Sequence, residues 1–203
     1  MPRLNSRAVL IAALLVVGGC ASQKTVPLPE IQGWEARTAI LAERERWAFS
    51  GRVAVSANDD GFNGKIRWNQ DGDGFLTTVS GPLGVGKTKV ENDGVRTLHT
   101  DKDGVQTELV DAEAELYYRY GWTIPVRSLR YWALGIPDPS LPAATEFGED
   151  GELTALEQGG WTVSISQYRD FGAKVGENMP RIVTAKSSGT RVRIVIDKWQ
   201  FFD

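Results

Sequence analysis

The chain has one cysteine and one histidine among its 203 residues. An internal disulfide is therefore excluded, and a zinc site or a catalytic triad built on cysteine or histidine is disfavoured. The single histidine, His99, is expected to be a half-exposed residue of a strand. We therefore expect a protein that holds no metal.

The sequence also has no excess of positive charge. Residues 1–19 hold two of the 23 basic residues and none of the 26 acidic ones, so the rest of the chain carries a net charge of −5. A mildly acidic chain is poorly suited to binding nucleic acid or anionic lipid through its bulk charge. Nucleic acid is therefore not an expected partner.

The N-terminal apolar run is short. Residues 8–17 follow Arg3 and Arg7 and precede Gly18, Gly19 and Cys20. This run is too short for a permanent transmembrane helix, and its flanks are typical of a secretory signal. The run Val17-Gly18-Gly19-Cys20 resembles a bacterial lipobox, which predicts cleavage and lipidation at Cys20. The alternative is an ordinary signal peptide that happens to contain a cysteine.

A lipidated Cys20 predicts a location as well as an anchor. Three acyl chains exceed what stable membrane anchoring needs. No aspartate follows the cysteine, and by resemblance to the lipoprotein sorting rule this implies the outer membrane, facing the periplasm. We predict a signal peptide over residues 1–19, a lipidated N-terminus and tether over residues 20–33, and one domain over residues 34–203.

Most of the domain alternates between apolar and polar residues. Short alternating runs joined by Asp-Gly and Asn-Asp-Gly turns predict an antiparallel meander. Helix-forming segments are predicted over residues 34–47, 111–120 and 126–134. The expected fold is an α+β protein with a curved antiparallel sheet, an incomplete barrel whose open face is covered by helices. The strands are predicted over residues 47–56, 64–69, 75–80, 87–91, 95–99, 105–109, 153–158, 161–168, 181–186 and 191–199.

Residues 81–88, Gly-Pro-Leu-Gly-Val-Gly-Lys-Thr, allow competing interpretations. They match G-x-x-x-x-G-K-[ST], the phosphate-binding loop of nucleotide hydrolases. That loop needs a helix directly after it, whereas a turn signal at residues 92–94 follows Thr88 within a few residues. A plain glycine hairpin remains open. So does an exposed apolar prong carrying Leu83, which could gain about 1.5–3 kcal/mol by burial among acyl chains.

Several motifs together resemble the LolB family of outer-membrane lipoproteins. They are the lipobox, W-x-F-x-G-R-V-A-V at residues 47–55, K-I-R-W at 65–68, G-P-L-G at 81–84, I-P-V-R-S-L-R-Y-W-x-L-G at 124–135, and the final V-x-I-x-x-D-x-W at 192–199. The resemblance implies an unclosed antiparallel half-barrel with helices as a lid over a hydrophobic cavity. It also implies that the protein accepts lipoproteins from the periplasmic carrier LolA and incorporates them into the outer membrane, without a cofactor and without acting as an enzyme.

The resemblance also implies partners and sites. The partners are LolA, the acyl chains of client lipoproteins and outer-membrane phospholipid, and the protein is expected to be a monomer. Pro82, Leu83 and Gly84 would form a membrane-insertion loop. A lipid-anchored β-rich binding module or assembly factor without transfer activity is the alternative. Ten residues are candidates for the cavity lining: Val53, Val55, Ile66, Trp68, Leu129, Trp132, Val163, Ile165, Ile194 and Ile196. A one-residue slip in strand register would invert the face assignment, and each residue could equally be ordinary core.

Overall fold

The computed structural model describes residues 24–57, 60–111, 114–115, 117–118, 125–172 and 174–203. The predicted signal peptide and Cys20 lie outside the described residues, and so does most of the helix predicted over residues 111–120. Within these ranges, no helix combines the length and the apolar character that crossing a membrane requires.

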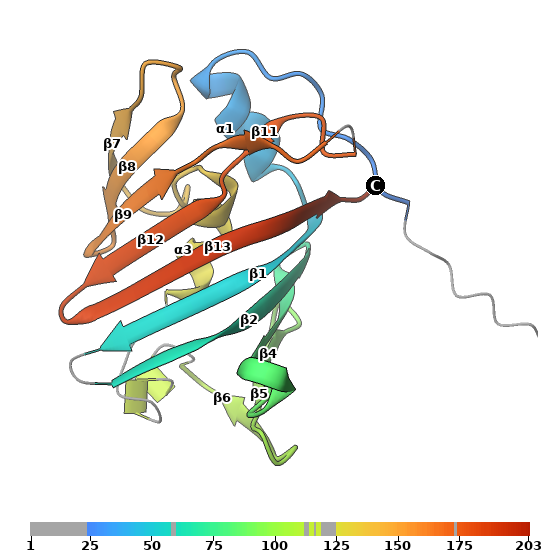
Figure 1. The fold of residues 1–203 in the computed structure, drawn as a ribbon, viewed down its shortest axis with the longest axis vertical. Coiled ribbons are helices and arrows are strands. Elements are labelled where there is room, and N and C mark those ends of the chain that lie inside the picture. Colours follow the sequence, from blue (N-terminus) through green and yellow to red (C-terminus); the bar gives the residue numbers. More distant parts are fainter. Residues whose placement is uncertain (1–23, 58–59, 112–113, 116, 119–124, 173) are drawn as a thin grey trace, which may run out of the picture.

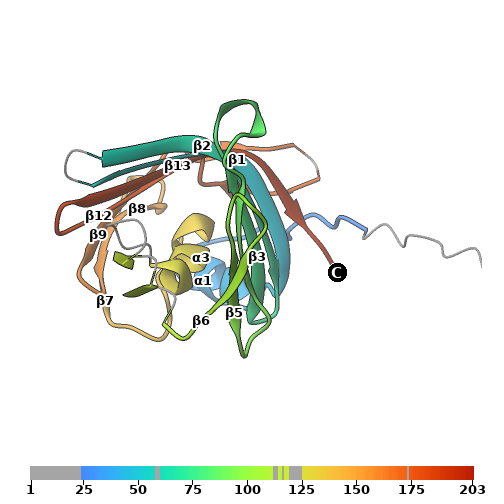
Figure 2. The same cartoon turned by 90° about the horizontal axis from the view of Figure 1, so that it is seen from below.

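The domain is built on one eleven-stranded antiparallel sheet, in the order β6-β5-β4-β3-β2-β1-β13-β12-β9-β8-β7. The two outermost strands, β6 and β7, do not pair with each other, so the sheet curves without closing (Figures 1 and 2). The predicted half-barrel is therefore confirmed. The strands are β1 (Arg46–Ala57), β2 (Asp60–Asp71), β3 (Gly74–Ser80), β4 (Thr88–Asn92), β5 (Thr97–Thr100), β6 (Gln106–Leu109), β7 (Ala143–Phe147), β8 (Leu153–Gln158), β9 (Trp161–Ser166), β12 (Ile182–Ser187) and β13 (Thr190–Phe201).

Side-chain alternation decides which face of the sheet is buried. In β9, the buried Trp161, Val163 and Ile165 alternate with exposed residues. Successive strand residues point to opposite faces, so the apolar set lies on the concave side. Aromatic rings reinforce this face, and those of Trp47 and Trp68 stack with centroids 6.4 Å apart. The concave side thus holds the core, and the convex side faces solvent over most of its area.

Two helices lie inside the curve of the sheet (Figure 2). Helix α3 (Val126–Leu134) has the predicted bounds and ends at Gly135, whose φ of 79° is the left-handed value that favours glycine. Helix α1 (Trp34–Ala42) is shorter than predicted. The helix prediction is wrong over residues 43–47, because α1 ends at Ala42. Trp47, which the strand prediction also includes, lies in β1 opposite Gln70 and Phe201. Strand pairing and aromatic packing there outweigh the helix propensity of residues 43–46.

The sequence pattern does not predict strand β7 or a small second sheet. All five residues of β7 are exposed, so its sequence has no alternation of apolar and polar residues to detect. A small second sheet pairs β10 (Arg169–Asp170) with β11 (Asn178–Met179), where the sequence pattern predicts no strand. No residue of β7, β10 or β11 lines the cavity described below.

Part of the segment predicted as a tether packs against the domain. Thr25 forms a β-bridge with Phe202. The amide of Leu28 donates to the carbonyl oxygen of Val175 over 2.7 Å, and the side chain of Leu28 is buried. The packed chain therefore begins before Trp34. At about 3.5 Å per residue, the five steps from Cys20 to Thr25 reach at most about 18 Å.

Candidate functional site

A mainly apolar cavity of about 480 Å³ lies between the concave face of the sheet and α3. Its polar lining comes from strands β3 to β5 and from the turn between β5 and β6: Thr77, Thr88, His99, Asp101, Lys102 and Asp103. The apolar wall is formed by side chains from β1 to β4, β13 and α3: Val53, Val55, Phe62, Ile66, Trp68, Val79, Val90, Val126, Leu129, Val192 and Ile194.

The structure brings some of the predicted cavity residues around this space and places the others elsewhere. Val53, Val55, Ile66, Trp68, Leu129 and Ile194 line the cavity. Four others are buried in the hydrophobic core without lining it: Trp132, Val163, Ile165 and Ile196. The sequence pattern identifies the concave face, but it does not show where packing on that face stops and the cavity begins.

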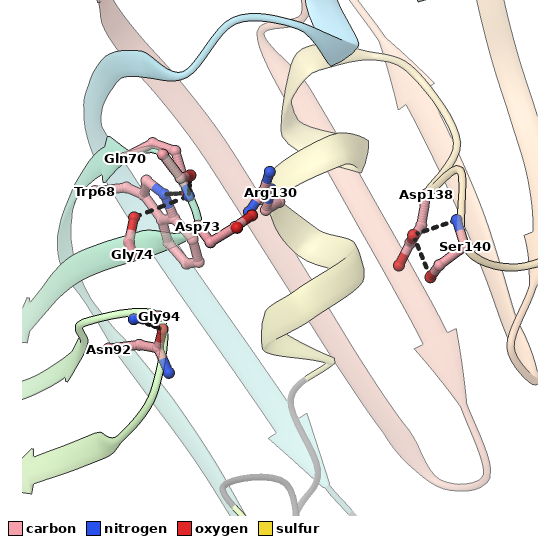
Figure 3. A network of polar contacts seen from close by, with 10 residues as sticks. Trp68, Gln70, Asp73, Gly74, Asn92, Gly94, Arg130, Asp138 and Ser140 are labelled. Carbon is pink, nitrogen blue, oxygen red and sulfur yellow. Dashed lines mark hydrogen bonds and ion pairs between the residues drawn. The ribbon is translucent and has the colours of Figure 1, made fainter.

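Trp68 presents an apolar surface to the cavity because its one polar atom is bonded elsewhere. Its Nε1 donates to Oε1 of Gln70 over 3.0 Å, and Nε2 of Gln70 donates to the carbonyl oxygens of Gly72 and Gly74 (Figure 3). Trp68 is only 2% exposed. The turn between β2 and β3 thus fixes the orientation of the indole ring on the cavity wall.

Helix α3 is bonded to the barrel on both sides. Nε1 of Trp132 donates to Oε1 of the buried Gln158 over 2.8 Å, and the hydroxyl of Ser128 donates to Asp138 over 2.9 Å. On the other side, Arg130 forms an ion pair with Asp73 at 3.7 Å (Figure 3). Trp132 therefore holds the helix that covers the cavity, while Leu129, three residues before it, lines the cavity.

His99 is the most deeply buried polar residue of the cavity wall. Its side chain is 2% exposed, so the expectation of a half-exposed histidine is wrong. It faces inward because it lies opposite Val90 in β4, and both residues line the cavity. Nε2 of His99 lies 2.9 Å from the hydroxyl of Thr88. The sequence does not reveal that His99 is buried in the cavity wall. Its neighbours Leu98 and Thr100 are both half-buried, so the strand shows no clear alternation between a buried and an exposed face.

Leu83 lies at the tip of the turn between β3 and β4 and is 100% exposed. Pro82–Gly84 form a short 3-10 turn, and Leu83 has φ 57° and ψ 16°. A non-glycine residue in this left-handed region costs about 1–2 kcal/mol. The strained backbone therefore holds an apolar side chain entirely in solvent. Figure 2 shows this green turn standing out from the sheet, away from α1 and α3.

The residues that follow the turn exclude a phosphate-binding loop. Thr88 begins strand β4 rather than a helix. The hydroxyl of Thr88, which would bind magnesium in such a loop, instead donates to the carbonyl oxygen of Thr100 over 3.0 Å. The match to the nucleotide-binding pattern is therefore a coincidence of sequence. The same segment connects the turn to the cavity, because Gly86 and Thr88 both line it.

The aspartates in the turns have a structural role. Oδ1 of Asp101 accepts hydrogen bonds from the amides of Asp103 and Val105, each 2.9 Å long. These bonds, chiefly that from Val105, hold the pKa of Asp101 below its ordinary value. Asp93 accepts hydrogen bonds from the amides of Arg96 and Val95 in the preceding hairpin, and these bonds, chiefly that from Arg96, lower its pKa.

Comparison with known proteins gives the family. The model of the family described as outer membrane lipoprotein LolB matches residues 45–199. The chain belongs to the LolB family. The matched segment contains the whole cavity lining together with Leu83. Membership therefore covers the part of the chain in which the cavity and the projecting turn are built.

LolB relatives match nearly the full length of the chain. The outer-membrane lipoprotein LolB of Nitrosococcus oceani is 34% identical over 95% of this chain and 96% of that protein. The LolB of Chromohalobacter salexigens is 31% identical over 95% of this chain and 87% of that protein. A solved DUF1329 family protein from Desulfovibrio piger has a TM-score of 0.52 at 6% identity, covering 81% of this chain and 89% of that one. That last likeness concerns the fold alone.

Proposed function

We propose that this LolB-family protein accepts lipoproteins from the periplasmic carrier LolA and incorporates them into the outer membrane. The observation that carries the proposal is the close connection between an apolar cavity and a fully exposed apolar side chain. Gly86 lines the cavity, and Leu83, three residues earlier, is 100% exposed. The cavity is suited to acyl chains, and the exposed Leu83 is suited to the membrane that receives them.

The cavity would hold the acyl chains of the client. Each CH₂ group that leaves water for an apolar environment gains about 0.8 kcal/mol. The carrier, the cavity and the membrane each offer such an environment, so transfer needs a downhill order of affinities rather than ATP. No bond is broken in this process, and the protein acts without catalytic residues and without a cofactor.

Leu83 would bring the loaded protein into contact with the bilayer. Burial of one leucine among acyl chains gains about 1.5–3 kcal/mol. This is too little for permanent insertion but enough for a transient contact, in which the tip of the turn enters phospholipid while the cavity lies at its base. The exposure and the strained backbone of Leu83 support this role for Pro82, Leu83 and Gly84.

Cys20 would keep the domain at its membrane. The relatives are named outer-membrane lipoproteins, which supports an outer-membrane location, and the lipobox supports lipidation at Cys20 with the domain in the periplasm. Because Thr25 is already paired with the domain, the chain between it and Cys20 is short, and it limits the domain to a narrow range of distances from the bilayer.

The test is uptake of a client by the protein without its anchor. Residues 21–203 are mixed with LolA that carries a radiolabelled lipoprotein, and the two proteins are separated. The proposal predicts that the label moves to this chain. If the label stays on LolA while the protein is folded, the transfer function is wrong, and a lipid-anchored binding module or assembly factor becomes the better account of the same sheet.

A further inference from the structure

The convex face beside the Leu83 turn carries more positive charge than the acidic chain as a whole suggests. Inward and outward positions alternate along each strand, and Ile66 and Trp68 of β2 line the cavity. Lys65 and Arg67 therefore point to the convex side, and both are exposed. Directly opposed residues on neighbouring strands share a face, so the strand register identifies the rest of this surface.

Two cross-strand rows hold these charges. Lys65 lies opposite Arg52 on β1 and opposite Ser80, the last residue of β3 before the turn. Arg67 lies opposite Ser50, which in turn pairs with Lys198, and opposite Thr78, which pairs with Lys89. Lys87 is exposed in the segment that leads from the turn into β4. We call these six residues the basic patch: Arg52, Lys65, Arg67, Lys87, Lys89 and Lys198.

Neighbouring acids leave most of the patch uncompensated. Arg52 pairs with Asp197 at 3.1 Å, and Lys89 pairs with Glu91 at 2.7 Å. Among the described residues, no ion pair involves Lys65, Arg67, Lys87 or Lys198. Arg52 and Lys65 are moreover directly opposed like charges, an arrangement that destabilises a sheet and that Asp197 offsets only on the side of Arg52. An anionic group placed between these side chains would relieve the repulsion between them.

We infer that the basic patch binds the phosphate groups of phospholipid headgroups when Leu83 enters the membrane. Charge complementarity supports this occupant, and so does position. The row that contains Lys65 ends at Ser80, the residue directly before the turn, and Lys87 follows the turn. A bilayer that receives the tip of the turn therefore lies against cations on both sides of it. This inference rests on the membrane role proposed for Leu83.

The magnitude of the effect can be stated for each residue. A basic side chain close to an anionic membrane surface strengthens binding about fivefold. Replacement of three such residues should weaken binding about a hundredfold. The effect should fall in 1 M salt, where the screening length shrinks to about 3 Å. Zwitterionic vesicles, whose surface carries no net charge, should show little of it.

The experiment measures partition of residues 21–203 onto vesicles of phosphatidylcholine with or without a third of phosphatidylglycerol. All described elements lie within residues 24–203, so this fragment retains them. The test variant is K65Q/R67Q/K87Q. The matched control is K186Q/R191Q/R193Q, which removes equal charge from the same face on β12 and β13, strands further from the turn. A third variant, L83A, tests the turn itself.

The proposal predicts that K65Q/R67Q/K87Q loses about a hundredfold of its binding to phosphatidylglycerol vesicles and little to pure phosphatidylcholine. The control triple should lose less than tenfold. If the two triple variants lose equal amounts of vesicle binding, the claim of a local site at the basic patch is wrong. If neither loses vesicle binding, the claim that the patch binds lipid is wrong. If the test triple binds vesicles normally but takes up lipoprotein from LolA more slowly, the patch serves an acidic protein, and the inference is wrong.

The L83A variant separates this inference from the proposed function. Removal of Leu83 should weaken partition by about tenfold or more on both vesicle compositions, because its burial is independent of charge. If L83A partitions normally while the basic triple does not, the prong hypothesis fails and the headgroup site remains. If L83A partitions weakly and K65Q/R67Q/K87Q partitions as wild type, Leu83 has its membrane role and the headgroup site is wrong.

Discussion

The amide of Gly81 donates to the carbonyl oxygen of Val85 over 2.8 Å, and this hydrogen bond closes the turn that carries Leu83. A side chain at position 81 would meet that oxygen at 3.0 Å, so the close approach favours glycine. Two further bonds, from Gly84 to Gly81 and from Val85 to Pro82, fix the tip. Leu83 is therefore presented by a defined backbone conformation.

Substitutions at Leu83 should separate stability from membrane activity. L83G removes the left-handed strain of about 1–2 kcal/mol but adds about 0.5–1 kcal/mol of backbone entropy cost. We therefore expect the free energy of unfolding to rise by about 0.5–1 kcal/mol, while lipoprotein insertion is lost. L83I keeps the apolar surface but is β-branched, so it should lose stability and retain insertion. Urea denaturation and a liposome transfer assay measure the two quantities.

This account is contradicted if stability and lipoprotein insertion change in parallel. If L83G loses both stability and insertion, or if L83I loses insertion together with stability, the turn acts through folding of the domain. The exposed side chain would then have no separate role at the membrane.

Blocking the cavity should abolish acyl binding without unfolding the protein. V53W places an indole in the space of about 480 Å³ that Val53 lines, so it should compete with a fluorescent apolar probe. V163W is the matched control, because Val163 is fully buried outside the cavity. Overpacking there should cost more unfolding free energy than the roughly 1–3 kcal/mol typical of added methylenes, and it should leave probe binding intact in the folded fraction. Equal probe binding in V53W and wild type would contradict the assignment of the cavity.

Gln158 should be critical for stability because it serves four partners from a buried position. Its amide bonds Trp132, the backbone N–H and carbonyl oxygen of Asp138, and the carbonyl oxygen of Leu141. Q158L leaves these buried groups unpaired, so we expect a loss of about 3–5 kcal/mol in unfolding free energy. Q106L, at an exposed position of edge strand β6, should change it by less than about 0.5 kcal/mol. Similar values for the two variants would refute the structural role of this network.

Acid should weaken the hairpin between β5 and β6. The pKa of Asp101 is lowered in the folded protein from an ordinary value of 3.8. Its stabilising contribution is therefore fully present above the unfolded-state pKa and is lost as the pH falls through the folded-state pKa. D101N keeps an acceptor oxygen but does not titrate, so the stability of the variant should decline less than that of wild type between pH 5 and pH 2. Urea midpoints across this range measure the difference, and parallel profiles would contradict it.

The fold follows from the sequence to the extent that local pattern decides it. Alternation and Asp-Gly turns locate most strands, and the bounds of β8 and α3 are as predicted. The sequence predicts both a helix and a strand at Trp47, and pairing with Phe201 decides for the strand. β7 could not be predicted because its exposed residues carry no burial pattern.

The site follows less completely. The prominence of Leu83 is visible in the sequence as Gly, Pro and Gly around one apolar residue. The position of His99 in the cavity wall and the grouping of cations on the convex face depend on strand register, because they join residues far apart in the chain. Net charge conceals this grouping, since it averages over both faces of the sheet.

The central claim is that Leu83 delivers lipoproteins to the membrane. The most direct measurement is the rate at which a radiolabelled lipoprotein passes from LolA through this protein into liposomes, comparing L83E with V95E. Val95 is also a nearly fully exposed apolar residue, at 89%, but it lies in the hairpin between β4 and β5. The account predicts that L83E accepts the client and fails to release it into liposomes, whereas V95E delivers at the wild-type rate. Delivery by L83E at the wild-type rate would contradict it.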